Sequence, residues 1–281
     1  MSMTALVSAF ARAYHAGRVG AKIFEDKYAQ ALLSEEEYRQ ISGHMAAGIS
    51  FFDPDFRGDD AAALRRVMDG FLSPTPLARA AFAAKAQNGD AAQLLTLASG
   101  YDTVGYGSGL PVFELDRPEV LTDKRARLRR AGIAEENMRF IPADLSGTDW
   151  PAAVLAAGFN AEKVTFCTVL GLSYYLTAAE TERLLSGAAP LLAPDSRIVL
   201  DVPIAGQRVQ GALASAAGEA MRSVYSITSL EAMARRCGLH LRRWLLPQDI
   251  QARFFDPYNT ETPDFPMYAP PDVAYAVLEK A

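Results

Sequence analysis

Cysteine, histidine and tryptophan are scarce in this chain of 281 residues, which holds two, three and two of them. The cysteines, Cys167 and Cys237, stand far apart in apolar surroundings, so we expect buried reduced thiols and no disulfide framework. His15, His44 and His240 are scattered without ligand spacing for zinc or iron. The composition therefore predicts a metal-free protein.

Long apolar runs and an excess of positive charge are also missing. No run of about 18 uncharged apolar residues occurs, so no membrane-spanning helix is predicted. The N-terminal segment carries no basic residue before its apolar part, which favours a helix over an export signal. The net charge of −5 argues against binding to a nucleic-acid backbone as the main function. We expect a cytoplasmic protein that binds neither nucleic acid nor membrane.

The stretch from Gln93 to Asp116 combines a buried strand, a glycine turn and a second strand that ends on an acid. The strands are predicted over Leu94 to Ala98 and Val112 to Leu115, with Ser99 and Gly100 in the turn. Small residues let the backbone pass close beside a ligand, and an acid at the end of the neighbouring strand can accept both hydroxyls of a ribose. On these residues alone, a nucleoside site and an ordinary strand-turn-strand unit are equally good interpretations.

The turn does not match the phosphate-binding pattern G-x-G-x-x-G, because Ala98 and Ser99 precede Gly100. Without that fingerprint the pattern favours a nucleoside ligand that carries no phosphates, and S-adenosylmethionine is the common ligand of this kind. A nicotinamide-dependent oxidoreductase is disfavoured for the same reason.

The chain is expected to form a helical N-terminal cap over 1–92 and an α/β core over 93–281. Apolar residues recur at helical spacing through the cap, including 23–33, and Ser34 before three glutamates is typical of a helix N-cap. In the core, strands and helices alternate, which is typical of a parallel sheet covered on both faces. The last two strands have no helix between them and indicate an edge hairpin, so we expect a Rossmann-like fold with an antiparallel last strand. Seven strands are predicted, over 94–98, 112–115, 139–143, 164–169, 197–202, 240–246 and 273–278.

Two further segments are interpreted as surface. Residues 247–271, rich in proline and aromatic residues, are predicted to form a long loop. A helix is predicted to begin at Pro118 and to carry a basic face, which we interpret as solvated surface. The basic residues are Lys124, Arg125, Arg127, Arg129 and Arg130.

Several motifs follow one another in the order LASGYDT, VFELD with DRPEV and KRARL after it, RFIPADL and GLSYYLT. Together they resemble the leucine carboxyl methyltransferase family, and TALVSAFARAYHA, KIFEDKYAQALL and SPTPLAR are similar to the N-terminal cap of one bacterial branch. The resemblance covers nearly the whole chain. It implies a class I S-adenosylmethionine-dependent methyltransferase with a helical lid.

The resemblance implies that Arg79 holds the carboxylate of S-adenosylmethionine, a charge-assisted contact for which a guanidinium is well suited. Ala98, Ser99 and Gly100 match the glycine turn under the methionine part. The family turn is usually Gly-Ala-Gly, so this chain adds a methyl group where the backbone approaches the ligand. An exposed helix residue is the alternative interpretation of Arg79.

Asp116 matches the family's ribose-binding acid, and Asp144 with Leu145 matches the pair that reads the adenine. Leu170 stands where many members carry a glutamate, although members with GLSYYLT-like segments have leucine. Taken singly, Asp116 also fits a helix cap and Asp144 a turn. Two acids at the ends of successive strands after a glycine turn are better explained by one nucleoside.

The acceptor is expected to be a carboxylate of a small-molecule metabolite. A carboxylate is ionised at neutral pH and needs no general base, whereas a hydroxyl needs one, and no histidine falls in the strand-end segments. The alternative function is a non-catalytic protein that binds S-adenosylmethionine or S-adenosylhomocysteine. The sequence predicts no oligomeric state.

Substrate contacts are expected from the lid and from loops at the carboxyl ends of the strands. Tyr174 and Tyr175 follow the fourth strand, and Tyr14 and Arg12 lie in the first helix. Arg253 precedes an aromatic-rich segment and can pair with an acid. The alternative is that these aromatic residues only anchor a long loop on the sheet.

Overall fold

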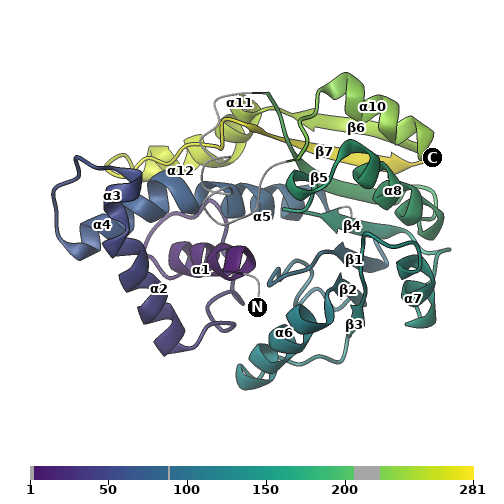
Figure 1. Ribbon diagram of the computed structural model, residues 1–281, viewed down its shortest axis with the longest axis horizontal. Coiled ribbons are helices and arrows are strands. Elements are labelled where there is room, and N and C mark those ends of the chain that lie inside the picture. Colours follow the sequence, from purple (N-terminus) through teal and green to yellow (C-terminus); the bar gives the residue numbers. More distant parts are fainter. Residues whose placement is uncertain (1–2, 88, 206–221) are drawn as a thin grey trace.

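The computed structural model describes residues 3–87, 89–205 and 222–281. Its centre is a seven-stranded sheet in the order β3-β2-β1-β4-β5-β7-β6 (Figure 1). β1 to β5 pair in parallel, and β7 runs antiparallel to both β5 and β6. The predicted fold class is confirmed, and the strand boundaries differ from the predicted ones by one or two residues. The strands are β1 Gln93–Leu97, β2 Val112–Asp116, β3 Met138–Pro142, β4 Thr165–Val169, β5 Arg197–Pro203, β6 Leu239–Leu245 and β7 Val273–Lys280.

Helices cover both faces of the sheet, which explains the nearly continuous apolar runs of its central strands. Leu95 and Leu97 of β1 face the core shared with α7, α8 and α10, whereas Leu94 faces α5. α5 therefore packs on the sheet although it precedes residue 93, and the division into 1–92 and 93–281 stays a prediction. The helices in the described part of the chain are α1 Met3–Ala16, α2 Glu35–Ala47, α3 Ile49–Phe52, α4 Asp60–Val67, α5 Pro74–Ala86, α6 Pro118–Arg130, α7 Trp150–Ala156, α8 Ala178–Ala188, α10 Ile227–Arg236, α11 Pro247–Ile250 and α12 Asp256–Glu261.

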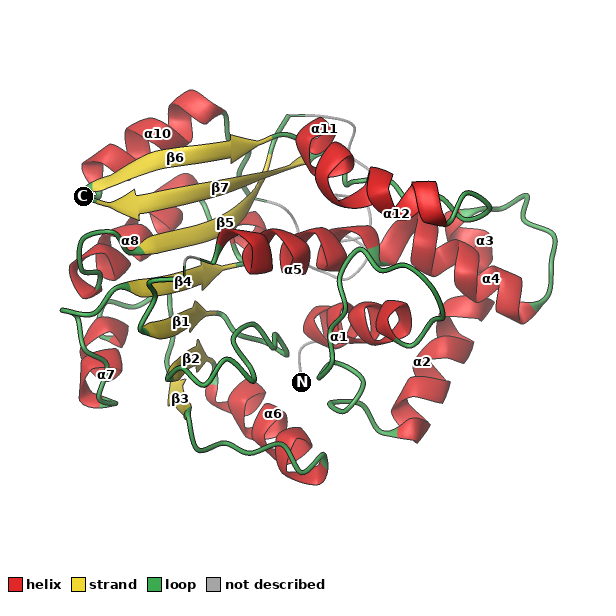
Figure 2. Ribbon diagram, turned by 180° about the vertical axis from the view of Figure 1, so that it is seen from behind, coloured by secondary structure: helices red, strands yellow, loops and turns green. Residues whose placement is uncertain are grey.

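The lid, which we define as α1 to α4, lies beyond the carboxyl ends of the parallel strands (Figure 2). A buried carboxylate, Asp26, joins the lid to the core. It accepts hydrogen bonds from Arg12 Nε on α1 and from Thr103 Oγ1 after β1, both at 2.8 Å, and from the backbone amides of 28–29. Arg12 also donates to the carbonyl of Tyr101. One charge pair thus fixes α1 against the loop that follows β1.

The basic helix α6 is the second connection between lid and core. The interpretation of its basic face as solvated surface is wrong for two residues, Lys124 and Arg127. Lys124 is fully buried in an ion pair with Glu114 at 2.7 Å. Arg127, 4% exposed, donates to Glu37 of α2 and to the carbonyl of Leu32. Such charges are buried only with a partner, and here the partners come from β2 and from the lid.

Two segments differ from the predicted secondary structure. Residues 23–33 form turns and not a helix, because Asp26 and the His15 ring bind their backbone amides. Residues 247–271 are not one long loop, since they contain α11, a π-helical turn over Gln251–Phe255 and α12. Pro247 and Pro257 stand in the first turns of these helices, where proline is tolerated. The N-cap at Ser34 is confirmed, with a capping box to Glu37.

Replacing Glu37 by Gln is expected to loosen the lid. Although partial burial opposes ionisation, hydrogen bonds from Arg127 and Ser34 lower the pKa of Glu37 from 4.5 to about 2. A lowered pKa in the folded state stabilises the protein above about pH 4.5, and this stabilisation disappears as the pH falls toward 2. We expect Glu37→Gln to cost about 1–2 kcal/mol at pH 7 and to flatten the loss of stability across that window. Urea unfolding from pH 7 to pH 2.5 measures both, and an equal cost at every pH would contradict this role.

Candidate functional site

A cavity of about 550 Å³ lies at the carboxyl ends of β1 and β4. The strand order reverses between these two strands, and open α/β sheets bind their ligands at such a point. The cavity walls come from α1, α5 and the segments after β1, β2 and β4. Its volume falls within the roughly 300–1,000 Å³ typical of small-molecule sites.

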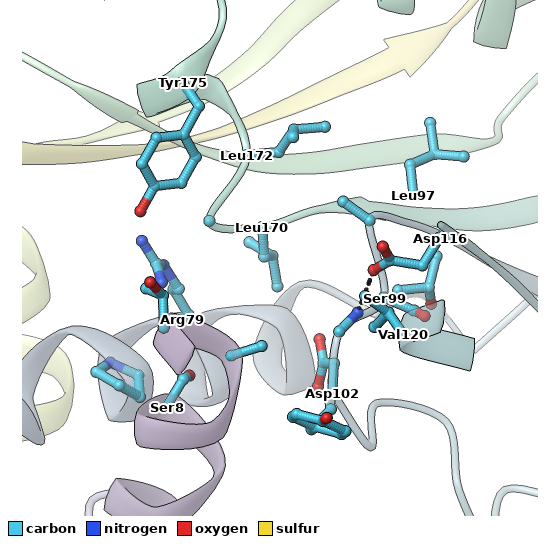
Figure 3. A pocket seen from close by; sticks show the side chains of 18 of the residues that line it. Ser8, Arg79, Leu97, Ser99, Asp102, Asp116, Val120, Leu170, Leu172 and Tyr175 are labelled. Carbon is cyan, nitrogen blue, oxygen red and sulfur yellow. Dashed lines mark hydrogen bonds between the residues drawn. The ribbon is translucent and has the colours of Figure 1, made fainter. Parts of the chain in front are cut away.

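The turn after β1 and the acid that ends β2 meet on one wall of the cavity (Figure 3). Asp116 accepts a hydrogen bond from the Gly100 amide at 2.7 Å and another from the Arg117 amide at 2.8 Å. Each carboxylate oxygen has two lone pairs, so both can accept a further bond from a ligand. Ser99 also lines the cavity, and its buried hydroxyl has no hydrogen-bond partner among the described residues. This wall therefore offers two carboxylate oxygens to a polar ligand.

Arg79 of α5 lies on the other side of Leu170 from Asp116 (Figure 3). Its Nε donates to the buried carboxylate of Asp201, and the hydroxyl of Tyr175 points toward its guanidinium (Figure 3). Although burial opposes protonation, Asp201 raises the pKa of Arg79 above its usual value. The cavity thus has a permanent cation at one end and an acid at the other.

Eight of the thirteen site residues predicted from the sequence line this cavity. The structure brings together Arg12, Arg79, Ala98, Ser99, Gly100, Asp116, Leu170 and Tyr175. They come from α1, from α5 and from the ends of β1, β2 and β4, so distant parts of the sequence converge at one cavity. Their individual roles stay predictions.

The other five predicted residues lie outside the residues that line the cavity. Asp144 is exposed and accepts hydrogen bonds from the amide and hydroxyl of Ser146, which is a turn geometry. Leu145 packs on the core beside α7 and α8, and Tyr14 packs inside the lid. Tyr174 is buried and donates to Asp201, while Arg253 is exposed in the turn before α12. Adenine binding by Asp144 and Leu145 stays a prediction without a contact that supports it.

Comparison with known proteins identifies the family of this chain. A family model described as leucine carboxyl methyltransferase matches residues 5–189. One relative is the Bacillus subtilis (strain 168) protein YktD, whose name describes it as an S-adenosyl-L-methionine-dependent methyltransferase. It is 34% identical, and the match covers 90% of this chain and 91% of the length of YktD. A Mycobacterium avium (strain 104) protein with such a name is 31% identical over 72% of this chain and 66% of its own. The chain belongs to the leucine carboxyl methyltransferase family.

Solved structures show the same fold. Mitomycin 7-O-methyltransferase MmcR is 18% identical, covers 98% of this chain and 68% of its own, and superposes with a TM-score of 0.50. An O-methyltransferase family protein from Burkholderia thailandensis is 13% identical, covers 83% and 63%, and also scores 0.50. At these identities the likeness concerns the fold alone.

Three residues of this leucine carboxyl methyltransferase family member line the cavity although the sequence analysis did not predict them. Ser8 of α1, Asp102 after β1 and Arg222 before α10 line it. Ser8 accepts a hydrogen bond from Arg12, so its own hydroxyl hydrogen can be donated to a ligand. Asp201 lies just behind the wall, and its signal was an acid inside the apolar strand RIVLDVP, where a carboxylate needs a partner.

Two absences concern only the described ranges, 3–87, 89–205 and 222–281. No group of three or more His, Cys, Asp and Glu side chains there is arranged to hold a metal ion. None of the helices there combines the length and apolar character needed to cross a membrane.

The turn of this leucine carboxyl methyltransferase family member carries backbone strain at Ala98, whose φ is +57°. An alanine in this left-handed region costs roughly 1–2 kcal/mol, and Ala98 lines the cavity. Asp195, in the turn before β5, has a φ of +67° but does not line the cavity.

Replacing Ala98 by glycine is expected to tighten cofactor binding. Both Ala98→Gly and Asp195→Gly should raise the free energy of unfolding, by about 0.5–1 kcal/mol once the extra freedom of the unfolded chain is subtracted. Only Ala98→Gly should lower the dissociation constant of S-adenosylhomocysteine, by roughly fivefold or about 1 kcal/mol of binding free energy, because it relieves overpacking at the wall. Calorimetric titration of both variants measures the two dissociation constants, and equal values for Ala98→Gly and Asp195→Gly would contradict this expectation.

Proposed function

We propose that this protein transfers the methyl group of S-adenosylmethionine to a carboxylate oxygen of a small-molecule acceptor. Membership of the leucine carboxyl methyltransferase family makes the chain a methyltransferase that uses this cofactor. The acceptor and the residue roles are the proposal. The observation that carries it is one cavity with an acid, Asp116, and a cation, Arg79, on opposite sides of Leu170.

The donors and acceptors around the cavity fit the cofactor. Asp116 can accept the ribose hydroxyls, and Arg79 can bind the methionine carboxylate. Ser99 lines the same wall of the cavity as Asp116. Gly100 lets the backbone approach, since its φ is +46° and a side chain there would press on Ala5 of α1 at 3.2 Å. These are the residues that would hold the cofactor.

The work left to the protein is orientation and exclusion of water. When bound, S-adenosylmethionine supplies a methyl group that its sulfonium activates. The lid supplies one wall of the cavity through Ala5, Ser8 and Arg12, and so separates the turn after β1 from solvent. A nucleophile held in line in such a site gains by proximity and by the exclusion of water.

Arg222 is the residue that we assign to the acceptor carboxylate. All three side-chain nitrogens of Arg12 already donate hydrogen bonds, to Asp26, Ser8 and Tyr101. Arg79 is assigned to the cofactor. The Arg222 side chain is half exposed and pairs with Glu180 at 3.1 Å. A surface pair of this kind is worth about 0–1 kcal/mol, so an acceptor carboxylate can take the place of Glu180. No histidine belongs to the described cavity lining, which also favours an acceptor that needs no general base.

Binding and turnover together test the function. Calorimetric titration should give micromolar binding of S-adenosylmethionine and S-adenosylhomocysteine, about −8 kcal/mol, and no binding of NAD. A panel of carboxylic acids with radiolabelled S-adenosylmethionine should then give base-labile methyl esters. Binding of the cofactor with turnover only on hydroxyl acceptors would overturn the carboxylate assignment. Binding with no turnover on any acceptor would favour the non-catalytic alternative.

The acceptor assignment predicts different effects at two arginines. Arg222→Gln should raise KM for the carboxylic acid about tenfold, the effect of losing roughly 1.5 kcal/mol of charged hydrogen bonding, and should leave the affinity for S-adenosylhomocysteine unchanged. Arg253→Gln is the matched control, because Arg253 is exposed and lies outside the cavity lining. A KM effect at Arg253 and none at Arg222 would assign the acceptor to the sequence-predicted residue instead.

A further inference from the structure

The guanidinium of Arg79 has close neighbours besides the cavity. It lies directly against the backbone after β4, where a side chain built on Gly171 would come within 3.0 Å of Nη1 and 3.2 Å of Cζ. Gly171 has a φ of +71°, so glycine suits this position for two reasons. The ring of Tyr174 lies 5.2 Å from Cζ. Neighbours on two sides thus limit where the guanidinium can lie.

The carboxylate of Asp201 binds Arg79 and both of these neighbours, Gly171 and Tyr174. Asp201 stands near the end of β5 and has no exposed surface. It accepts hydrogen bonds from Arg79 Nε, from the Gly171 amide at 2.7 Å and from the Tyr174 hydroxyl at 2.9 Å. Arg79 and Gly171 both line the cavity, whereas Asp201 does not. A carboxylate in this position can reach a bound ligand only through the residues that it holds.

We propose that Asp201 is a positioning residue that fixes the Nε edge of Arg79 and so presents the Nη groups to the carboxylate of the cofactor's methionine part. The inference rests on the proposed function, because it needs S-adenosylmethionine in this cavity. It adds a residue from β5 to a site assigned to α5 and to the ends of β1, β2 and β4.

The physical basis is the shape of the guanidinium. Its five N–H donors form a rigid planar fork, and Asp201 engages the one at Nε. Fixing that edge fixes the direction of the four donors on the Nη atoms, and the long side chain loses its rotamer freedom before the ligand arrives. Preorganisation of this kind raises affinity because less ordering is left to the binding step. A purely structural ion pair would instead stabilise the fold without favouring one ligand.

Two ligands separate these roles. S-adenosylhomocysteine carries the amino-acid carboxylate, and 5′-methylthioadenosine carries the same nucleoside and sulfur without it. Calorimetry on the whole protein gives both dissociation constants, and their ratio isolates the contribution of the carboxylate. In Asp201→Asn the ratio should shift roughly 10-fold or more against S-adenosylhomocysteine, with little change for methylthioadenosine.

Ser173→Ala is the matched control for Asp201→Asn. Ser173 is buried in the same segment and donates to the backbone carbonyl of Asp201, so its loss disturbs the surroundings without touching the carboxylate. The ratio should not move in this control. Arg79→Gln should shift the ratio as Asp201→Asn does, and the double variant should shift it no further than Arg79→Gln alone.

The outcomes are distinct. An equal loss for both ligands in Asp201→Asn, or no loss at all, overturns the positioning role. A double variant that loses more than Arg79→Gln also overturns it, because Asp201 would then act by another route. If Asp201→Asn does not fold, Asp201→Glu keeps the charge, displaces the guanidinium by one methylene and must give the same selective loss. If the unaltered protein binds neither ligand, the proposed function fails before this inference is reached.

Discussion

The site depends on one buried carboxylate in the lid, Asp26. It binds Arg12 of α1, Thr103 after β1 and the backbone of the turn at 28–29. An isolated buried carboxylate is costly, and these donors together offset that cost. These contacts fix the position of α1, because the guanidinium of Arg12 must reach both Asp26 and the carbonyl of Tyr101. That position makes the lid a wall of the cavity.

Buried charge in this protein serves geometry, and each pair joins two elements. Lys124 with Glu114 joins α6 to β2, and Arg127 joins α6 to the lid. Arg79 with Asp201 joins α5 to the end of β5. Buried pairs add little net stability compared with apolar packing, but breaking one is strongly destabilising. The pairs therefore fix where α1, α5 and α6 stand relative to the strand ends.

The sequence was informative where the signal is local. The strand, turn and acid at 93–116 and the capping box at Ser34 can each be recognised within a few residues, and the structure contains them. The charge pairs could not be found this way, because their partners are far apart in sequence. Arg79 and Asp201 are separated by 122 positions and Glu37 and Arg127 by 90. The basic face of α6 looks solvated in the sequence because Lys124 and Arg127 reach partners on other elements, Glu114 of β2 and Glu37 of α2, which the spacing within the helix does not indicate.

Two helical predictions show a similar limit. Apolar spacing over 23–33 suits a helix, but Asp26 takes the amides of that segment and holds it in turns. Prolines in 247–271 suggested a loop, yet two of them begin short helices. In both segments tertiary contacts or the position within a turn override local propensity. Arg222 was missed because nothing in its own neighbourhood marks an arginine at a cavity rim.

A crystal structure of the complex with S-adenosylhomocysteine tests the central claim most directly. The account predicts the ribose hydroxyls within hydrogen-bond distance of Asp116 and the amino-acid carboxylate on the Nη groups of Arg79, with the Arg79–Asp201 pair intact. A ligand bound elsewhere, or bound here with its carboxylate turned away from Arg79, would contradict it.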